Sequence, residues 1–346
     1  MKLTRERRVP LAAAGVAVAA ILVTACSSSS SSSASAPSSS TSASTSASAS
    51  ASSSATGSPA AMTNITVGSL PVLDTAGLQV AIKEGFFTAA GLNVTVKSVA
   101  QSTVAIPDLL HGSIDIIGGG NYVSFLEAQA HGTFKVEFLA PAVDCTTNNY
   151  GVVALPSSGI TKASDLAGKT IAVNLTQNIQ TLTTSAVLSA DGVNASSVKY
   201  VEIAFPDMVA AMKAGRVNAV SAVEPFLSAA LAAGGKLVTS TCTGPTANFP
   251  MSGYITTQGW VQQHPAAAKA FQTALEKGNA YANANPSVVR SVLPSYTTMT
   301  AAAAATVPLG MYPGSLTTTS LQSIATLMKS NGLTAPSDVS SLILSS

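Results

Sequence analysis

The sequence has few charges and few aromatic side chains for its 346 residues. Charged residues make up 9% and aromatic residues 5%, and only two arginines, Arg216 and Arg290, lie beyond position 8. Residues 1–25 hold four basic residues and one acid, so the rest of the chain has 13 basic against 14 acidic residues. This near-neutral balance argues against nucleic acid or an anionic membrane surface as a partner.

Motifs of common enzymes are missing too. We find no Gly-x-Ser-x-Gly, no His-Glu-x-x-His and no glycine-rich phosphate loop. His111, His131 and His264 stand alone, without a second ligand at metal spacing. Ser196 and Lys199 match Ser-x-x-Lys, but the motifs that accompany it in β-lactamases are absent. We therefore expect no enzyme activity, no metal and no cofactor.

The one long apolar run is at the N-terminus. Residues 11–23 follow a basic segment and lead into Val-Thr-Ala-Cys, which is typical of a bacterial lipoprotein cleavage site. We expect a signal peptide over residues 1–25, a lipid on Cys26, and a Ser/Ala-rich tether over residues 26–61. The protein would then be anchored by lipid at the extracytoplasmic face of the cell membrane. A simple signal peptide or an uncleaved anchor is the alternative, and both Sec and twin-arginine export remain open.

One pattern occurs twice, over residues 106–132 and 209–235. Gly112 aligns with Gly215 and Asn121 with Glu224. Each copy predicts a helix ending at a glycine, a short buried strand, a turn and a new helix. A buried strand between helices is typical of α/β sheets covered on both faces. The repeat therefore predicts two similar α/β lobes.

Ligands of α/β sheets collect at the carboxyl ends of strands, where helix N-termini present free N–H groups. Loops after strands, helix starts and the crossing between lobes supply the candidate ligand contacts: Asp74, Thr75, Gly120, Asn121, Tyr122, Asn149, Thr176, Gln177, Asn178 and Glu224. Helix capping is the alternative role for Asp74, Thr176 and Asn178. It is also open for Glu224, which precedes Pro225.

The order of predicted elements divides the chain. A strand at 65–70 and a helix at 76–90 open the first lobe, the chain crosses over near 150–155, and it returns at 252–257. We expect lobe 1 to comprise residues 62–148 and 252–346, and lobe 2 residues 149–251. Cys145 and Cys242 lie near the two crossings, which favours a disulfide in an exported protein over two separate buried thiols.

Five segments carry a family resemblance: residues 83–91, 112–120, 165–173, 206–211 and 224–226. In this order they resemble the substrate-binding proteins of bacterial ABC importers for nitrate, sulfonates, taurine and thiamine pyrimidine precursors. The resemblance implies an α/β, two-lobed periplasmic-binding-protein fold (type II) with two crossing strands at the hinge. It also implies a monomer that captures a small polar solute between its lobes and passes it to an ABC permease in the membrane.

Two other functions remain open from sequence alone. An exported protein that binds or processes a thiamine pyrimidine precursor is one, because precursor-synthesis proteins resemble this fold too. A structural or adhesive lipoprotein is the other. The candidate loops contain Asp74 and Glu224 but no lysine or arginine, and a carboxylate repels a second negative charge. The loops therefore predict an amine-bearing solute, such as an aminosulfonate zwitterion or an aminopyrimidine, over a bare inorganic anion.

Overall fold

The computed structural model describes residues 62–345. The predicted signal peptide (1–25), the tether (26–61) and the lipidation site Cys26 lie outside the described residues. Across residues 62–345, no helix is both long enough and apolar enough to cross a membrane.

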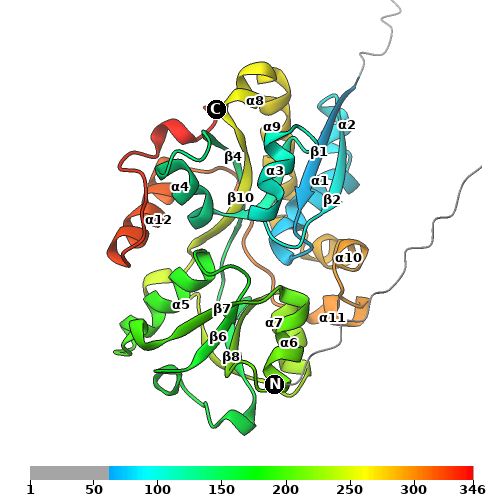
Figure 1. Ribbon diagram of the computed structural model, residues 1–346. Helices are drawn as coiled ribbons and strands as arrows, with labels where there is room; N and C mark the ends of the chain where they lie inside the picture. Colours follow the sequence, from blue (N-terminus) through cyan, green and yellow to red (C-terminus); the bar gives the residue numbers. More distant parts are fainter. Residues whose placement is uncertain (1–61, 346) are drawn as a thin grey trace, which may run out of the picture. The chain divides into compact units, whose positions relative to one another are not determined.

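The first sheet has five strands in the order β2-β1-β3-β10-β4 (Figure 1). Their bounds are Thr63–Ser69 (β1), Leu92–Ser98 (β2), Ile116–Asn121 (β3), Val136–Asp144 (β4) and Pro250–Thr257 (β10). β1 runs parallel to β2 and β3, whereas β10 pairs antiparallel with both β3 and β4. The helices grouped with this sheet are α1 (Ala76–Lys83), α2 (Phe86–Ala89), α3 (Ile106–Leu110), α4 (Tyr122–Ala130), α8 (Gln258–Gln263), α9 (Pro265–Ala284), α10 (Pro286–Tyr296), α11 (Ala301–Thr306) and α12 (Thr318–Ser330).

The second sheet also has five strands, in the order β7-β6-β8-β5-β9. Their bounds are Tyr150–Ala154 (β5), Thr170–Val173 (β6), Lys199–Glu202 (β7), Ala219–Val223 (β8) and Lys236–Ser240 (β9). Its helices are α5 (Ile179–Ala190), α6 (Phe205–Lys213) and α7 (Phe226–Ala232). Two mixed sheets with helices confirm the predicted α/β class. Below, lobe 1 is the first sheet with its helices, and lobe 2 is the second.

The repeated pattern forms equivalent elements in the two lobes. One copy forms β3 and α4, and the other forms β8 and α7. Both strands are fully buried, and each lies third in its sheet. Gly112 and Gly215 precede these strands with positive φ angles of 74° and 69°, a left-handed conformation that glycine adopts without steric cost. The glycines end one helix and aim the chain at the next strand, as the sequence predicted.

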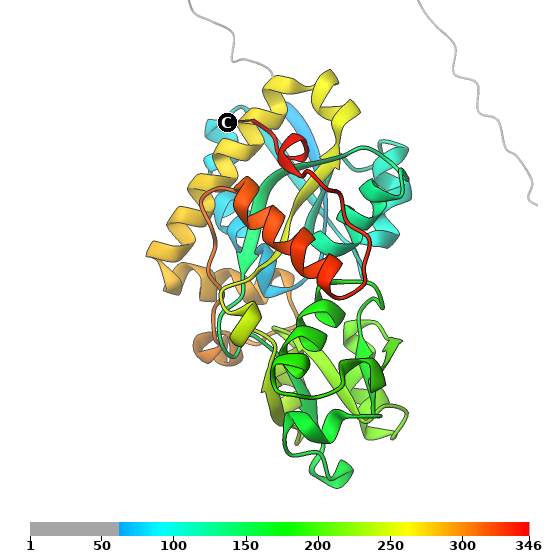
Figure 2. The same ribbon diagram turned by 90° about the vertical axis from the view of Figure 1, so that its left-hand side faces the viewer.

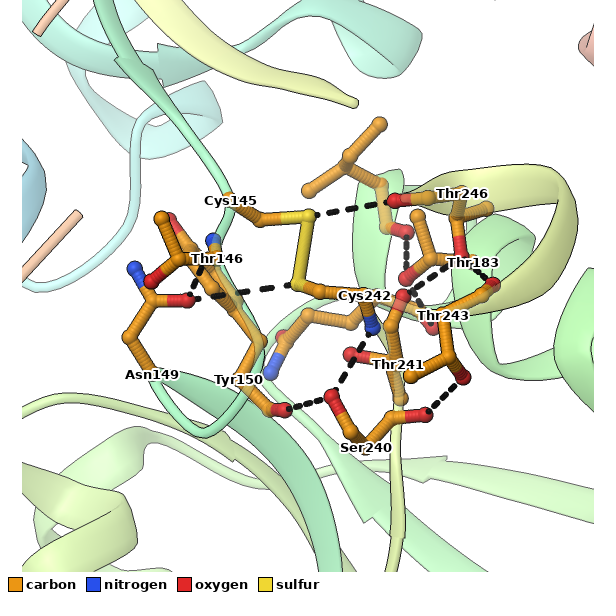
Figure 3. The surroundings of a disulfide bond; sticks show 12 residues. Cys145, Thr146, Asn149, Tyr150, Thr183, Ser240, Thr241, Cys242, Thr243 and Thr246 are labelled. Atoms are coloured by element: carbon orange, nitrogen blue, oxygen red, sulfur yellow. Dashed lines mark hydrogen bonds between the residues drawn. A yellow bond between two sulfur atoms is a disulfide. The ribbon is translucent and has the colours of Figure 1, made fainter. Parts of the chain in front are cut away.

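The chain crosses between the sheets twice. Residues 145–149 join β4 to β5, and residues 241–249 join β9 to β10. Cys145 and Cys242 sit in these two segments and form a disulfide, with Cα atoms 5.8 Å apart (Figure 3). Both cysteines are buried. The disulfide therefore ties the two crossing segments to each other.

One sequence-based boundary needs correction. The helix expected over 76–90 is divided into α1 and α2, because Gly85 adopts a left-handed conformation with φ of 74°. The last long helix, α12, packs against α4 of lobe 1 and also contacts α5 of lobe 2 (Figure 2).

Candidate functional site

A cavity lies where both sheets contribute lining residues. The cavity has a volume of about 40 Å³, which is room for a few water molecules or a small solute. Lobe 1 and the returning strand β10 line it with Leu70, Val72, Asp74, Ser102, Gly119, Asn121, Met251 and Ser252. Lobe 2 lines it with Tyr150, Asn174, Asn178, Ile179, Gln180, Phe205 and Val223. The loops after β1 and β6 and the carboxyl end of β3 all reach this cavity, as expected for an α/β binding site.

Asp74 is the acidic residue of this cavity. One of its carboxylate oxygens accepts a 2.6 Å hydrogen bond from the Tyr150 hydroxyl, and the other accepts a 2.7 Å bond from the Ser252 hydroxyl. Burial raises the pKa of Asp74, while the two hydroxyl bonds act in the opposite direction. The side chain thus joins the start of β5 and the middle of β10. It does not cap α1, whose N-terminus has no side-chain cap, so the capping alternative is wrong for Asp74.

A polar network in lobe 2 forms the opposite side of the cavity. Asn178 caps α5 by accepting bonds from the backbone N–H groups of Gln180 and Thr181. The Gln180 side chain accepts from the Asn174 N–H at 2.9 Å and donates to the Ser221 carbonyl at 2.7 Å. These bonds fix the loop between β6 and α5 against the end of β8.

The side-chain amide of Asn174 belongs to this loop but has no partner. Asn174 is 4% exposed and lines the cavity. Among the buried polar atoms of residues 62–345, its Nδ2 is one of the few without a hydrogen bond. A buried donor left in this state is costly.

Direct hydrogen bonds join the lobes around the cavity. Gln101 of lobe 1 donates to the Asn174 carbonyl at 2.6 Å, and Ser124 donates to the Gln177 carbonyl at 2.8 Å. The Leu73 N–H donates to the Glu224 carbonyl at 3.0 Å. The structure therefore shows the lobes in contact over the cavity.

The lining is mostly apolar in area, carries several polar groups, and contains no positive charge. None of the cavity-lining residues within 62–345 is lysine, arginine or histidine. Phe205 supplies a flat apolar wall, and its ring stacks on Phe226 with centroids 5.0 Å apart and planes 7° apart. The cavity thus combines a carboxylate, amides, hydroxyls and one aromatic face.

The cavity brings together only some of the residues that the sequence singled out. Asp74, Asn121 and Asn178 line it. Thr176 and Gln177 line a separate groove outside it, with Glu127 and His131. Neither of these two positions is the N-cap of α5, which is Asn178.

Four further candidates point away from the cavity or support its walls. An added Cβ at Gly120 would approach Ile255 and Phe125, so this position faces the core. Tyr122 is fully buried and packs on Phe138. The remaining two candidates hold loops in place: the Thr75 hydroxyl donates to the carbonyls of Leu70 and Val72, and the Asn149 side chain accepts from Thr146 at the first crossing (Figure 3).

Glu224 occupies the position that aligns with Asn121, yet its carboxylate turns into its own helix. It accepts from the backbone N–H of Ser228 at 3.2 Å and from the Ser228 hydroxyl at 2.9 Å. Burial raises the pKa of Glu224 to about 7. Glu224 is not among the residues lining the cavity. Its carboxylate accepts from an N–H in the first turn of α7, as the capping alternative expects, but the N-cap position of this helix is Pro225 and not Glu224.

Several lining residues were not predicted. Asn174 directly follows β6, so the rule that selected Asn121 could have found it. Gln180 lies within the first turn of α5, beyond the loop residues considered. Tyr150 and Ser252 lie on strands at the crossings, where only the alternation of side chains along the strand decides which residues face the cavity.

The sequence matches a family of known proteins. The model of the NMT1/THI5-like family matches residues 73–288, which is more than half of the chain. The chain belongs to the NMT1/THI5-like family. The match covers the whole second sheet, every strand of the first sheet except β1, and all of the cavity-lining residues except Leu70 and Val72. No curated protein matches the sequence.

Solved structures with the same fold include two solute-binding proteins and an enzyme. The alkanesulfonate-binding protein SsuA from Xanthomonas axonopodis pv. citri, bound to MOPS, has a TM-score of 0.68 and 17% identity over 82% of this chain and 99% of that one. The nitrate-binding protein NrtA from Synechocystis PCC 6803 has a TM-score of 0.61 and 17% identity, over 70% and 69%. The desulfurization enzyme DSZB has a TM-score of 0.57 and 18% identity, over 78% and 92%. At these identities the likeness shows the two-lobed fold.

Proposed function

We propose that this NMT1/THI5-like protein is the solute receptor of an ABC importer. It would bind a small polar solute between its two lobes and deliver it to a permease in the membrane. The cavity lined from both sheets carries this proposal, because a ligand held there contacts both lobes at once. The sulfonate- and nitrate-binding proteins that share the fold support it.

Closure would be the step that couples binding to delivery. A ligand drives closure only if it binds the closed state more tightly than the open state. The bonds from Gln101, Ser124 and Leu73 to lobe 2 form only when the lobes meet. We propose lobe boundaries at residues 62–148 with 252–346 and at 149–251, with the crossings as the hinge.

Attachment and oligomeric state complete this proposal. A lipid on Cys26 and a tether of residues 26–61 would hold a monomer at the extracytoplasmic face, beside the permease.

The family match and the cavity lining restrict the solute more than the fold alone does. We propose a small sulfonate-, taurine- or nitrate-type solute, with a thiamine pyrimidine precursor as the second candidate. The NMT1/THI5-like match and the Phe205 wall favour the second candidate, since a flat ring can stack on an aromatic side chain. Processing of such a precursor is an enzyme alternative, and the fold is shared with one named enzyme.

Titration calorimetry combined with product analysis tests the receptor proposal. We expect one solute bound per chain, recovered unchanged after long incubation, and a decrease in the radius of gyration in solution scattering. Gln180→Leu should weaken binding because it disrupts the loop that carries Asn174, whereas Gln177→Leu, at the outer groove, should bind normally. Chemical conversion of the solute would favour the enzyme, and the absence of any small-molecule binding would favour a structural lipoprotein.

A further inference from the structure

The cavity holds a buried hydrogen-bond donor that the rest of lobe 2 leaves unused. The backbone of Asn174 is fully engaged, because its N–H donates to Gln180 and its carbonyl accepts from Gln101. Its Nδ2, on a side chain that is 4% exposed, has no partner among residues 62–345. A buried donor that lacks a hydrogen-bond partner destabilises the folded state, so a ligand that accepts from this amide removes the cost.

The neighbouring side chains are committed elsewhere and do not compete for this amide. Gln180 uses its oxygen for the Asn174 N–H and for the Asn178 amide, and its nitrogen for the Ser221 carbonyl. The Asn178 oxygen caps α5. The network thus fixes the backbone of Asn174, a residue that lines the cavity, and leaves its buried side-chain Nδ2 without a partner among residues 62–345.

Lobe 1 supplies a hydrogen-bond acceptor, Asp74, where lobe 2 supplies a donor. Each oxygen of Asp74 accepts one hydroxyl bond, from Tyr150 or from Ser252. Each carboxylate oxygen can accept a further hydrogen bond. Because those two hydroxyls are already donating, the unused capacity at Asp74 is for accepting. Asn121 also lines the cavity; it uses one N–H of its amide to donate to Ser102 and its oxygen to accept from Ser124, so its second N–H is a further donor.

We infer that Asn174 and Asp74 bind opposite ends of one solute that has an acceptor group, an N–H donor and no net negative charge. Asn174 donates to the acceptor, and Asp74 accepts from an amine or ring-amino group. This inference rests on the proposed function of solute capture. Lysine, arginine and histidine are absent from the cavity lining within 62–345, so no positively charged side chain there offsets the repulsion between ionised Asp74 and a net anion; the N-terminus of α5 offsets it only modestly. Among the proposed solute classes, this favours a taurine-type zwitterion or an aminopyrimidine over plain alkanesulfonates and inorganic anions, although proteins that share the fold are named for the latter.

Matched pairs of probes test this on the unaltered protein by calorimetry. Taurine and propane-1-sulfonate differ by an ammonium in place of a methyl group, and 4-aminopyrimidine and 4-methylpyrimidine differ by an amino group. We expect the amine-bearing member of at least one pair to bind at least about tenfold more tightly than its partner. Nitrate and sulfate should show no binding.

Two variants connect this selectivity to the residues. Asn174→Ala should weaken binding of the preferred probe by about tenfold, whereas Asn93→Ala, an exposed amide on β2, should not. Asp74→Asn should reduce the preference for the amine-bearing member, and the melting temperature of each variant shows whether it is folded. Unchanged affinity in a folded Asn174→Ala protein would overturn the role of Asn174.

The remaining outcomes separate this inference from the proposed function. If propane-1-sulfonate, nitrate or sulfate binds as tightly as the amine-bearing probes, the inference is wrong and the receptor function stands. If no probe binds, the protein is exposed to a small-molecule cell extract and analysed by native mass spectrometry. A captured compound with an N–H donor and no net negative charge supports the inference, and a captured anion overturns it. No captured compound at all would overturn the receptor function as well.

Discussion

Breaking the Cys145–Cys242 bond should lower the stability of the protein substantially. The bond joins residues that are 97 positions apart in sequence. In the chain-entropy account, closing a loop of this length removes unfolded-state freedom equivalent to about 4.7 kcal/mol at 25 °C. Measured disulfides usually contribute less, so we expect a loss of about 2–4 kcal/mol on reduction.

Urea denaturation followed by circular dichroism measures this loss. The protein expressed from residue 27 lacks Cys26, so Cys145 and Cys242 are its only cysteines. With a urea dependence near 3 kcal/mol per molar, the midpoint should fall by on the order of 1 M on reduction. The double variant Cys145→Ala/Cys242→Ala should unfold at a similar midpoint with or without reductant, which controls for other effects of the reagent.

Thiol titration supplies the direct test. The denatured but unreduced protein should contain no free thiol, and the reduced protein should contain two. Two free thiols before reduction would refute the disulfide. An unchanged urea midpoint on reduction of a protein shown to be disulfide-bonded would refute the loop-entropy reasoning.

Three other perturbations have defined outcomes. Glu224 has a pKa of about 7 in the folded protein, above its ordinary value of 4.5. Between these two pH values the folded state binds more protons than the unfolded state, so the stability of the protein falls as pH rises through them. Glu224→Gln should therefore make the melting temperature less dependent on pH from about 5 to 8, and an unchanged slope would contradict this. Gly120→Ala should lower the melting temperature, because its Cβ would lie 2.3 Å from Ile255 and overpacking costs roughly 1–3 kcal/mol, while leaving solute affinity in the folded fraction unchanged; weaker binding without destabilisation would place Gly120 in the site after all. Cys26→Ser should abolish lipidation and release the protein from membranes on fractionation, whereas persistent membrane attachment with unchanged processed size would rule out lipidation at Cys26.

The fold was largely predictable because its signals are local. Gly112 and Gly215 mark helix ends through a backbone conformation that few other residues adopt. The apolar segments after them are too short for helices and are flanked by helical patterns. These signals act within a few residues, so they are visible in the sequence. The prediction of one continuous helix over 76–90 was wrong because the helix is interrupted at Gly85. The sequence alone does not show which glycines interrupt a helix and which are tolerated.

The site was only partly predictable because it depends on side-chain direction and on distant partners. Gly119 and Asn121 line the cavity while Gly120 between them faces the core, as expected from the alternation of side chains along β3. Asp74 has the sequence position of a helix cap, but its carboxylate is bound by Tyr150 and Ser252, 76 and 178 residues away. No local pattern contains those contacts.

The position of β10 has a consequence for how the protein folds as it is synthesised. β10 lies between β3 and β4, which are not paired with each other, and it is the last strand of the sheet to be synthesised. Until residues 250–257 emerge, the inner edges of β3 and β4 have no strand to pair with, although all five strands of the second sheet are already present. The second sheet can therefore form from one continuous segment, whereas the first sheet is complete only after residues 250–257 have been synthesised. A chain halted before residue 250 should thus leave two open strand edges exposed to proteolysis and aggregation.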